Sequence, residues 1–366
     1  MPAVRKIRVL IVDDSAIVRK ILAEALGGET DMEVVGSAPD PYVARDKILS
    51  LDPDVLTLDI EMPRMDGLTF LKKLMHFHPL PTVVISSLAQ PSCRAAIEAL
   101  ELGAVEVLAK PGGPYSVGDL RHSLADKIRA AAAARVRVAK SGDRVAAAPV
   151  ATGFAAAAGV VIAIGASTGG TEAIASVLRQ LPASSPGMVI AQHIPPQFSR
   201  AFANRLNDTC AMTVREAADG DRLDGGTALV APGDFHMLLR KSASGYYVSV
   251  KTGPRVCYQR PSVDVLFSSV AEAAGANAAG VLLTGMGADG ARGLLKMREA
   301  GARTIAQDEA SCVVFGMPRE AIALGAADQV TALERIPNAI LAACAPGAAR
   351  AARTVERERV PSMERG

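Results

Sequence analysis

Short apolar runs alternate with amphipathic stretches along most of the chain. The runs are rich in β-branched side chains, as is typical of strands buried in a parallel sheet. The stretches between them place apolar residues at helical spacing. Strands that alternate with helices in this way predict an α/β fold, with parallel sheets covered by helices on both faces.

The N-terminal third contains five such strands, each followed by a helix. We expect strands at 8–12, 34–37, 55–58, 82–85 and 105–108, and helices at 15–26, after Asp40-Pro41, at 66–75, at 92–102 and from 115 onward. Proline is well tolerated in the first turn of a helix, which supports the second of these helices. The pattern predicts a compact, doubly wound, flavodoxin-like domain.

The alternation resumes near residue 158 and continues to about residue 345. We expect strands at 160–164, 188–191, 213–217, 226–230, 279–283 and 304–307, and helices from 171, at 198–206, at 262–274, up to 299, at 317–324 and at 333–343. Two further strands, 235–240 and 246–251, flank a turn-forming Ser-Ala-Ser-Gly and predict a hairpin. The second domain is therefore expected to be Rossmann-like, a doubly wound parallel sheet with one antiparallel insertion.

The segments outside these two domains have a different composition. Residues 131–157 are small, basic and poor in large apolar side chains, and residues 346–366 are highly charged. We interpret the first as a flexible linker and the second as a disordered tail. The predicted organisation is a first domain at 1–130, the linker at 131–157, a second domain at 158–345 and the tail at 346–366.

Composition narrows the classes of function. The chain has 366 residues, a net charge of +2 and no Trp, which does not favour a nucleic-acid-binding surface. Its five cysteines are scattered without a CxxC pair, as expected of reduced thiols rather than disulfides or a zinc site. The chain has no apolar run long enough to cross a bilayer. We expect a soluble, cytoplasmic protein without membrane insertion.

Polar residues follow the predicted strands of the first domain. Asp13 and Asp14 end the first strand, Asp59 the third, Ser86 the fourth and Lys110 the fifth. The carboxyl ends of parallel strands meet at one edge of a sheet, where three carboxylates repel one another unless a cation such as Mg²⁺ intervenes. Helix capping could explain Asp14 alone, but not the whole set. The sequence therefore predicts an acyl-phosphate site with Asp59 as the phosphorylated nucleophile.

Over residues 6–130 the chain resembles the receiver domain of bacterial response regulators, with every one of these motifs present. The resemblance implies a Mg²⁺ ion held by three carboxylates and one backbone carbonyl: Asp14, Asp59 and the carbonyl of Glu61, with Asp13 assisting. It also implies that Ser86 and Lys110 sense the phosphoryl group.

The turn after the first strand of the second domain presents a serine between small residues. Ser167 lies in Gly-Ala-Ser-Thr-Gly-Gly, between an apolar strand and a helix. Glycines permit a sharp turn and leave room for a substrate, so the pattern suits a hydroxyl nucleophile. A serine in such a turn could equally cap the helix and nothing more.

Two further strands of this domain lead to residues that could activate a serine. His193 follows one strand, and Asp289 lies in the glycine-rich loop after another. A serine attacks only when a base takes its proton, and a carboxylate can orient that base. We therefore assign Ser167 as nucleophile, His193 as base and Asp289 as orienting acid. A lone histidine is more often structural, but only His193 follows an apolar strand in the same sheet as Ser167.

The loop around Asp289 also permits a different interpretation. Gly285-Met-Gly-Ala-Asp-Gly290 matches the GxGxxG pattern of dinucleotide-binding loops, and Asp308 and Glu309 follow the next strand. However, Asp289 would place a carboxylate beside a pyrophosphate. A nucleotide-dependent oxidoreductase and a DNA-binding response regulator remain the two alternatives, although the second domain has no basic recognition helix.

Taken together, the two domains resemble the family of chemotaxis response-regulator protein-glutamate methylesterases. GASTGG, AQHIPP, LLTGMGADG and FGMP all match that family. The resemblance implies hydrolysis of glutamate γ-methyl esters on chemoreceptors, release of methanol, and deamidation of certain receptor glutamines. It implies a chemotaxis histidine kinase as phosphodonor and no cofactor for the ester chemistry. We further expect the backbone N–H of Met286 to serve as an oxyanion donor.

Overall fold

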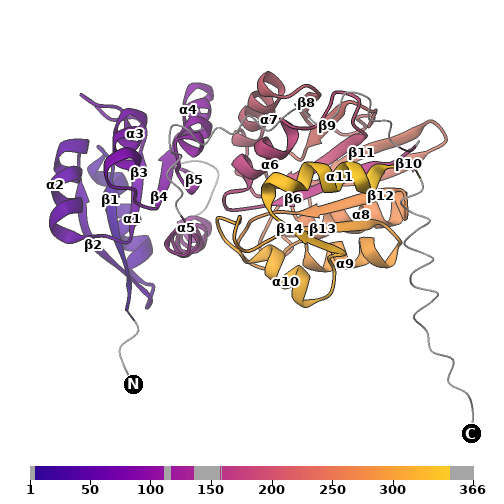
Figure 1. The fold of residues 1–366 in the computed structure, drawn as a ribbon. Helices are drawn as coiled ribbons and strands as arrows, with labels where there is room; N and C mark the ends of the chain where they lie inside the picture. Colours follow the sequence, from indigo (N-terminus) through magenta and orange to yellow (C-terminus); the bar gives the residue numbers. More distant parts are fainter. Residues whose placement is uncertain (1–4, 111–116, 136–156, 158, 347–366) are drawn as a thin grey trace, which may run out of the picture. The chain divides into compact units, whose positions relative to one another are not determined.

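The computed structural model describes residues 5–110, 117–135, 157 and 159–346 (Figure 1). The chain divides into two compact units, Met1–Val145 and Ala146–Gly366. Each unit has its own sheet, with helices on both faces (Figure 1). The predicted α/β fold class is confirmed. Of the linker expected at 131–157, residues 131 and 132 end a helix and residues 136–156 lie outside the described residues, as does the tail expected at 346–366 from residue 347 onward.

The first unit contains a five-stranded sheet in the order β2-β1-β3-β4-β5, in which every pairing is parallel. Its strands are β1 (Ile7–Val12), β2 (Met32–Ala38), β3 (Val55–Asp59), β4 (Thr82–Ser86) and β5 (Glu106–Ala109), and its helices are α1 (Ala16–Gly27), α2 (Pro41–Leu51), α3 (Gly67–Phe77), α4 (Gln90–Glu101) and α5 (Val117–Ala132).

Side-chain caps set where three of these helices begin. Ser15 accepts a hydrogen bond from the N–H of Val18, Asp40 from Tyr42 and Val43, and Asp66 from Thr69, each at the N-terminus of its helix. Such caps satisfy backbone donors that have no partner inside the helix. The predicted helices therefore start within a residue of the observed ones at these positions.

The second unit contains a seven-stranded parallel sheet in the order β14-β13-β12-β6-β7-β9-β8. Its strands are β6 (Val161–Ala166), β7 (Gly187–Gln192), β8 (Thr213–Glu216), β9 (Thr227–Val230), β12 (Ala278–Leu282), β13 (Arg303–Gln307) and β14 (Gln329–Thr331). Its helices are α6 (Gly170–Leu178), α7 (Phe198–Thr209), α8 (Val263–Ala274), α9 (Ala291–Glu299), α10 (Met317–Ala323), the 3₁₀ helix η1 (Leu333–Arg335) and α11 (Ile336–Cys344).

The antiparallel insertion is also present. Strands β10 (His236–Ser242) and β11 (Gly245–Lys251) pair with each other and join no other strand of the described chain. One strand was not predicted: β14 has three residues, and two of them are exposed. A three-residue strand at the edge of a sheet contains no apolar run from which it could be predicted.

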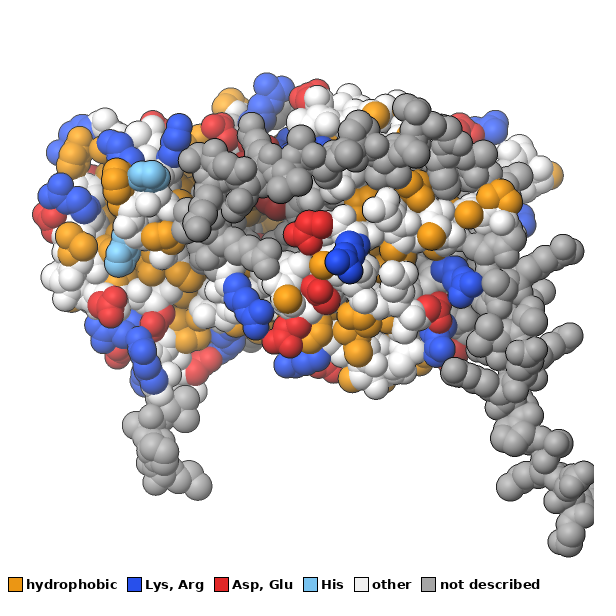
Figure 2. Space-filling model, viewed as in Figure 1, with side chains coloured by type: hydrophobic (Ala, Val, Ile, Leu, Met, Phe, Trp, Pro, Cys, Tyr) orange, Lys and Arg blue, Asp and Glu red, His pale blue; other side chains and the backbone are white. Residues whose placement is uncertain are grey.

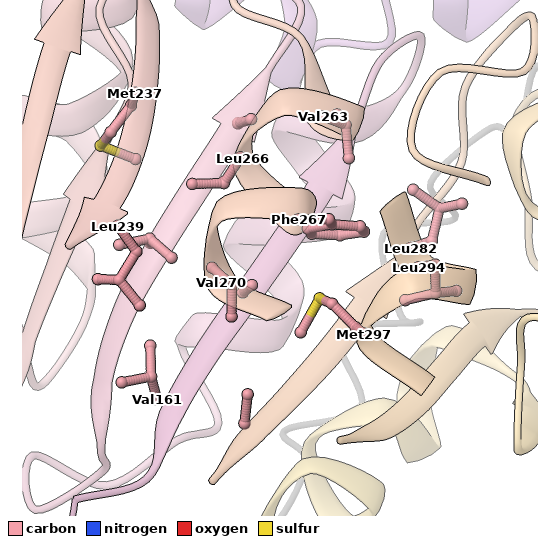
Figure 3. Packing of buried hydrophobic residues seen from close by; sticks show 14 of the residues in the cluster. Val161, Met237, Leu239, Val263, Leu266, Phe267, Val270, Leu282, Leu294 and Met297 are labelled. Carbon is pink, nitrogen blue, oxygen red and sulfur yellow. The ribbon is translucent and has the colours of Figure 1, made fainter. Parts of the chain in front are cut away.

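Helix α8 is central to the core of the second unit (Figure 3). Val263, Leu266, Phe267 and Val270 from its inner face are all fully or almost fully buried. A Cβ atom added to Gly165 of β6 would lie 2.2 Å from Val263 and 3.1 Å from Phe267, so the helix rests directly on this strand. The C-terminal end of β6, which leads into the turn with Ser167, is thereby fixed against α8.

The sheet order of the second unit creates a ligand-binding edge. Strand β6 lies between β7 and β12, so the chain leaves β6 toward one side and later returns on the other. In open α/β sheets, ligands bind at the carboxyl ends of the strands where the order reverses in this way. The loops that follow β6, β7 and β12 meet at this edge.

The surface carries charges of both signs (Figure 2), and the cysteines form no disulfides. Figure 2 shows the Lys and Arg side chains of one face interspersed with Asp and Glu, in keeping with a net charge of +2. The five cysteines, Cys93, Cys210, Cys257, Cys312 and Cys344, are free thiols. Within the described ranges, the helices are all too short or too polar to span a bilayer.

Candidate active site

Ser167 follows β6 directly and is buried in the turn that leads to α6. Its N–H donates to the carbonyl of Thr284 over 3.0 Å, and its carbonyl accepts from the N–H of Gly170 over 2.7 Å. Gly169, at φ +74°, takes the left-handed conformation that lets the chain reverse here. The backbone of the serine is thus held on both sides, within a turn between a strand and a helix.

His193 lies beside Ser167 on the neighbouring strand. Strands β6 and β7 pair in parallel with Ala166 opposite Gln192, so Ser167 and His193 occupy the next positions of the two strands. The N–H of His193 donates to the carbonyl of Ala166 over 3.1 Å. Neighbouring strands are about 5 Å apart, close enough for these two side chains to meet.

The buried side chain of Gln192 fixes both turns. Its Nε2 donates to the carbonyl of Ser167 over 2.8 Å and to that of His193 over 3.2 Å. A Cβ atom on Gly170 would lie 2.2 Å from Oε1 of this glutamine, so the start of α6 must be glycine for the amide to fit. The sequence analysis did not identify this role, although Gln192 stands directly before the predicted base.

Asp289 completes the contact to His193 from the loop before α9. Its Oδ2 lies 2.8 Å from His193 Nε2 and accepts the N–H of Val263 over 2.7 Å. Its Oδ1 accepts from the hydroxyl of Ser262 over 2.8 Å and from the N–H of Asp264 over 3.0 Å. The carboxylate is thus seated on the N-terminus of α8, where the helix dipole favours negative charge.

These contacts keep the carboxyl group of Asp289 ionised. Burial alone would raise the pKa of its carboxyl, but the hydrogen bond and charge of His193 and the N–H groups of Asp264 and Val263 lower it below its usual 3.8. The ionised carboxylate can only accept, so Nε2 of His193 carries the hydrogen of that bond. The other ring nitrogen, Nδ1, is buried and has no hydrogen-bond partner among the residues that the structure describes.

The hydroxyl of Ser167 makes no hydrogen bond within the described part of the chain. Ser167 and His193 occupy matching positions at the ends of two neighbouring strands, and no hydrogen bond joins their side chains in this structure. Catalytic hydrogen bonds are often loose in the absence of substrate. The structure brings Ser167, His193 and Asp289 to one edge of the sheet, with the histidine–aspartate bond already formed.

The glycine loop packs tightly against the serine. A Cβ atom on Gly285 would lie 2.7 Å from the Cβ of Ser167, and one on Gly316 would lie 2.7 Å from the carbonyl of Gly285. The FGMP segment is thereby stacked on the loop, with the N–H groups of Gly316 and Met317 donating to that carbonyl. Next along the chain, the N–H of Met286 makes no hydrogen bond to any described residue. This donor is free for a ligand close to the serine.

Thr284 ties three loops of the site together and was not singled out from the sequence. Its buried hydroxyl donates to the carbonyl of Thr168 over 3.0 Å and accepts from the N–H of Val314 over 3.0 Å. Its N–H donates to Gln307 Oε1 over 2.8 Å. Only the packing of the loops reveals this residue, because a threonine after a strand has no distinctive sequence signal.

The loop does not have the features expected of a dinucleotide site. Asp289 turns its carboxylate into the N-terminus of α8, where four donors hold it. Asp308 accepts from the N–H and hydroxyl of Ser311, three residues on, as a local turn cap. Asp289, which argued against the nucleotide pattern, and Asp308, which matched it, are thus both used within the fold.

The first unit gathers a second polar group at the carboxyl ends of β1, β3 and β5. Carboxylate oxygens of Asp13, Asp14 and Asp59 all lie within 4.8 Å of one another. Lys110 Nζ lies 2.7 Å from Asp59 Oδ2 and 3.8 Å from Asp13 Oδ2. The predicted carboxylates and the predicted lysine therefore come together.

The carboxylates of this group are not fully neutralised. Burial, and then repulsion from Asp59, raise the pKa of Asp13 from 3.8 to about 6. Burial also raises the pKa of Asp59, against the opposing effect of its bond to Lys110. Asp13 Oδ2 is buried without a hydrogen-bond partner. Three hard oxygen ligands with one unsatisfied oxygen fit a Mg²⁺ ion.

Ser86 and Glu61 lie close by but are engaged elsewhere. The hydroxyl of Ser86 donates to the carbonyl of Ser92 over 3.3 Å rather than toward Asp59. The N–H of Glu61 donates to Asp59 Oδ1 over 3.0 Å, while its carboxylate accepts from the hydroxyls of Ser87 and Ser92. The backbone of Glu61 therefore adjoins Asp59, and the side chain of Glu61 reaches Ser92 in the first turn of α4.

Comparison with known proteins divides the chain in the same way. Residues 162–340 match the family model described as CheB methylesterase, and residues 9–122 match the response regulator receiver domain. The solved catalytic domain of the CheB methylesterase of Thermotoga maritima is 36% identical, with a TM-score of 0.49, over 50% of this chain and 98% of that one.

Two relatives match almost their whole length. Protein-glutamate methylesterase/protein-glutamine glutaminase 2 of Syntrophus aciditrophicus (strain SB) is 57% identical over 92% of this chain and 98% of its own. Protein-glutamate methylesterase/protein-glutamine glutaminase of Salmonella choleraesuis (strain SC-B67) is 53% identical over 94% of this chain and 99% of its own. With identity this high across both units, the chain belongs to the protein-glutamate methylesterase/protein-glutamine glutaminase family.

Proposed function

We propose that this chain is a phosphorylation-regulated serine hydrolase that removes methyl groups from glutamate γ-methyl esters of chemoreceptors and deamidates particular receptor glutamines. The names of its relatives and its two domain families support this activity. The observation that carries it is the set of contacts at the sheet edge. Asp289 holds Nε2 of His193 at 2.8 Å, the described residues leave Nδ1 without a hydrogen-bond partner, and Ser167 occupies the matching position at the end of the neighbouring strand.

Formation of the acyl-enzyme uses Nδ1 of His193 as the base. Nδ1 takes the hydroxyl proton of Ser167 as Oγ attacks the ester carbonyl, and the imidazolium is stabilised by the ionised Asp289. The tetrahedral intermediate then collapses, its bond to the methoxy oxygen breaks, and the imidazolium returns the proton to release methanol. No cofactor enters this chemistry.

Hydrolysis of the acyl-enzyme repeats the sequence with water. Nδ1 removes a proton from the attacking water, and the second tetrahedral intermediate expels the serine oxygen, which regains the proton. The product is the free glutamate side chain. When a glutamine amide is the substrate, the first step releases ammonia in place of methanol.

The backbone N–H of Met286 is our candidate for stabilising the oxyanion. It has no hydrogen-bond partner among the described residues and belongs to the loop that packs on Ser167. A donor fixed in advance stabilises charge that develops only in the transition state.

The first unit serves as the phosphorylation switch, with Asp59 as the phosphorylated residue. The carboxylates of Asp13, Asp14 and Asp59 and the backbone carbonyl of Glu61 would hold Mg²⁺, which offsets the negative charge of the phosphoryl group when bound. Lys110, already 2.7 Å from Asp59, would pair with a phosphoryl oxygen. Ser86 would have to give up its bond to Ser92 to reach that group.

The partners follow from this activity. Methylated chemoreceptors are the substrate, and a chemotaxis histidine kinase is the phosphodonor. We expect the enzyme to act in the cytoplasm, and its five free thiols support a reducing compartment.

The test of the ester chemistry is methanol release from methylated receptor. Ser167→Ala should lower turnover at least about 10³-fold, because no other group can form the acyl-enzyme. Ser176→Ala, in the helix that follows, is the matched control and should keep wild-type turnover. Turnover retained by Ser167→Ala would contradict the assignment.

A second measurement tests the switch. Acetyl phosphate with Mg²⁺ should raise methanol release by the full-length protein, and Asp59→Asn should abolish that stimulation. Stimulation that persists in Asp59→Asn would show that the phosphoryl group acts elsewhere.

A further inference from the structure

A two-residue turn beside the catalytic group presents an aromatic side chain to solvent. Val256 and Gln259 exchange both backbone hydrogen bonds, with N···O distances of 3.1 and 2.9 Å, so Cys257 and Tyr258 form the tip. Tyr258 is 88% exposed. We refer to residues 256–259 as the Tyr258 turn.

The tip has a backbone conformation that its residues disfavour. Cys257 has φ +50° and Tyr258 has φ +63°, in the left-handed region at both positions. Two-residue turns of this kind normally contain asparagine or glycine, because a Cβ atom is strained there. Backbone strain persists where the surrounding structure enforces it, and such places cluster at functional sites.

Both arms of the turn are anchored. Asp234 Oδ1 accepts from Arg255 over 3.2 Å and from Arg260 Nη2 over 2.8 Å. His236 Nε2 donates to the carbonyl of Pro254 over 2.9 Å. These contacts hold the strained tip in place and fix the position of the tyrosine.

The turn adjoins the acid end of the catalytic group. Cys257 Sγ lies within 4.8 Å of carboxylate oxygens of Asp264 and Asp289. Both oxygens of Asp289 already accept two hydrogen bonds each, so this grouping is not built for a cation. Of two other exposed apolar side chains, Phe235 follows Asp234, which anchors the turn, and Met286 belongs to the loop that carries Asp289.

We propose that Tyr258 is a substrate-contact residue that favours a glutamyl ester carried on a folded polypeptide over the ester of a free amino acid. This inference rests on the proposed esterase function. A helix with its side chains is about 10–12 Å across, so a helix that offers an ester to Ser167 also covers the surface beside it. A rigid exposed tyrosine supplies a large contact area at low entropic cost, as at interaction hot spots.

The experiment compares two substrates with the full-length protein. Methanol release is measured from methylated chemoreceptor and from N-acetylglutamate γ-methyl ester. Tyr258→Ala should lower kcat/KM about tenfold on the receptor, in the range of a hot-spot truncation, and leave the small ester within about twofold. Tyr258→Phe should retain most of the receptor activity, because the ring supplies most of the contact area.

Two further variants separate contact from folding. Tyr258→Gly suits a positive φ, so its melting temperature should not fall, yet it should lose receptor activity as Tyr258→Ala does. Leu324→Ala removes another side chain that is 48% exposed, at the end of α10, and should leave both substrates unaffected.

The outcomes are distinct. Unchanged receptor activity in Tyr258→Ala, or an equal loss on both substrates, would overturn the role in substrate selection. Wild-type protein that releases no methanol from either ester would overturn the esterase function itself, and the Tyr258 proposal with it.

Discussion

Both units place carboxylates at the carboxyl edge of a parallel sheet, but the groups that surround these carboxylates differ. In the first unit, one buried oxygen of Asp13 has no hydrogen-bond partner among the described residues, and the pKa of this carboxyl is raised to about 6. In the second unit, Asp289 fills both oxygens with four donors, and its pKa lies below the usual value.

This difference distinguishes a carboxylate that can bind a ligand from one that holds neighbouring protein groups in position. A buried carboxylate with an unsatisfied oxygen is electrostatically incomplete and gains from a cation or another ligand. A carboxylate with every oxygen engaged has nothing left for a ligand and can only fix the groups around it. The environment of each aspartate, rather than its place at a strand end, therefore indicates its role.

The largest effect should come from Asp289→Asn. Two donors face each oxygen of Asp289, so the NH₂ group of asparagine must oppose two donors whichever way the amide turns. An amide can also donate to His193 Nε2, which would move the imidazole hydrogen to Nδ1 and remove the base. We expect kcat for methanol release to fall about 10³–10⁴-fold, as for comparable catalytic aspartates.

Asp264→Asn is the matched control for that variant. Asp264 is adjacent to Asp289 and partly buried, and its Oδ1 accepts the N–H of Gly293 over 2.6 Å without contacting His193. We expect its kcat to stay within about fivefold of wild type. Similar losses in the two variants would mean that general disruption of α8, rather than orientation of the histidine, limits turnover.

The next effect concerns stability of the first unit. The pKa of Asp13 rises from 3.8 to about 6 on folding, so the folded state binds its proton more tightly than the unfolded state. The free energy of unfolding should therefore fall as pH rises from about 4 to about 6, and the loss remains above that range. Without divalent cations at pH 8, Asp13→Asn should raise the free energy of unfolding by about 1–3 kcal/mol, since one pKa unit is about 1.4 kcal/mol.

Calorimetry of the full chain at pH 4 and pH 8, with and without Mg²⁺, tests this expectation. The stabilisation by Asp13→Asn should become small near pH 4, where the carboxyl is protonated in the folded state and about half protonated in the unfolded state. Mg²⁺ should stabilise wild type more than the variant. A variant that is less stable than wild type at pH 8 in chelator would contradict the unsatisfied state of the site.

The smallest effect compares two buried threonines. The hydroxyl of Thr284 joins Thr168 to Val314, whereas that of Thr57 in β3 is buried without a partner. Thr284→Val should cost about 1–2 kcal/mol of stability because it removes the acceptor of the buried N–H of Val314, and it should lower kcat by about threefold to tenfold. Thr57→Val should be neutral or stabilise by up to about 1 kcal/mol. Urea unfolding and methanol release measure both, and an equal cost at the two sites would refute the distinction.

Most of the fold could be predicted because its signals are local. Apolar runs mark the buried strands, and Ser15, Asp40 and Asp66 mark the starts of helices through bonds to residues two or three positions away. The exception, β14, is a three-residue edge strand whose Gln329 and Val330 are exposed. Its pairing depends on β13, not on its own sequence.

The candidate site was less accessible to sequence reasoning where it depends on distant contacts. Ser262 could be identified as the start of a helix, but its bond to Asp289, 27 residues away, exists only in the folded chain. The same holds for Thr284, whose partners come from two other loops. The nitrogen of His193 that faces Asp289 likewise follows from the geometry of the sheet.

Helix α8 gives the esterase unit one further property. Its first residues hold Asp289, while Phe267 and Val270, one and two turns further on, fill the interior against β6 (Figure 3). A substitution in this interior that shifts α8 therefore also shifts the N–H groups that hold Asp289, even where the altered side chain is remote from Ser167. Selection for heat resistance in this unit would have to pass through variants with changed turnover, so its durability and its catalytic speed are constrained to evolve together.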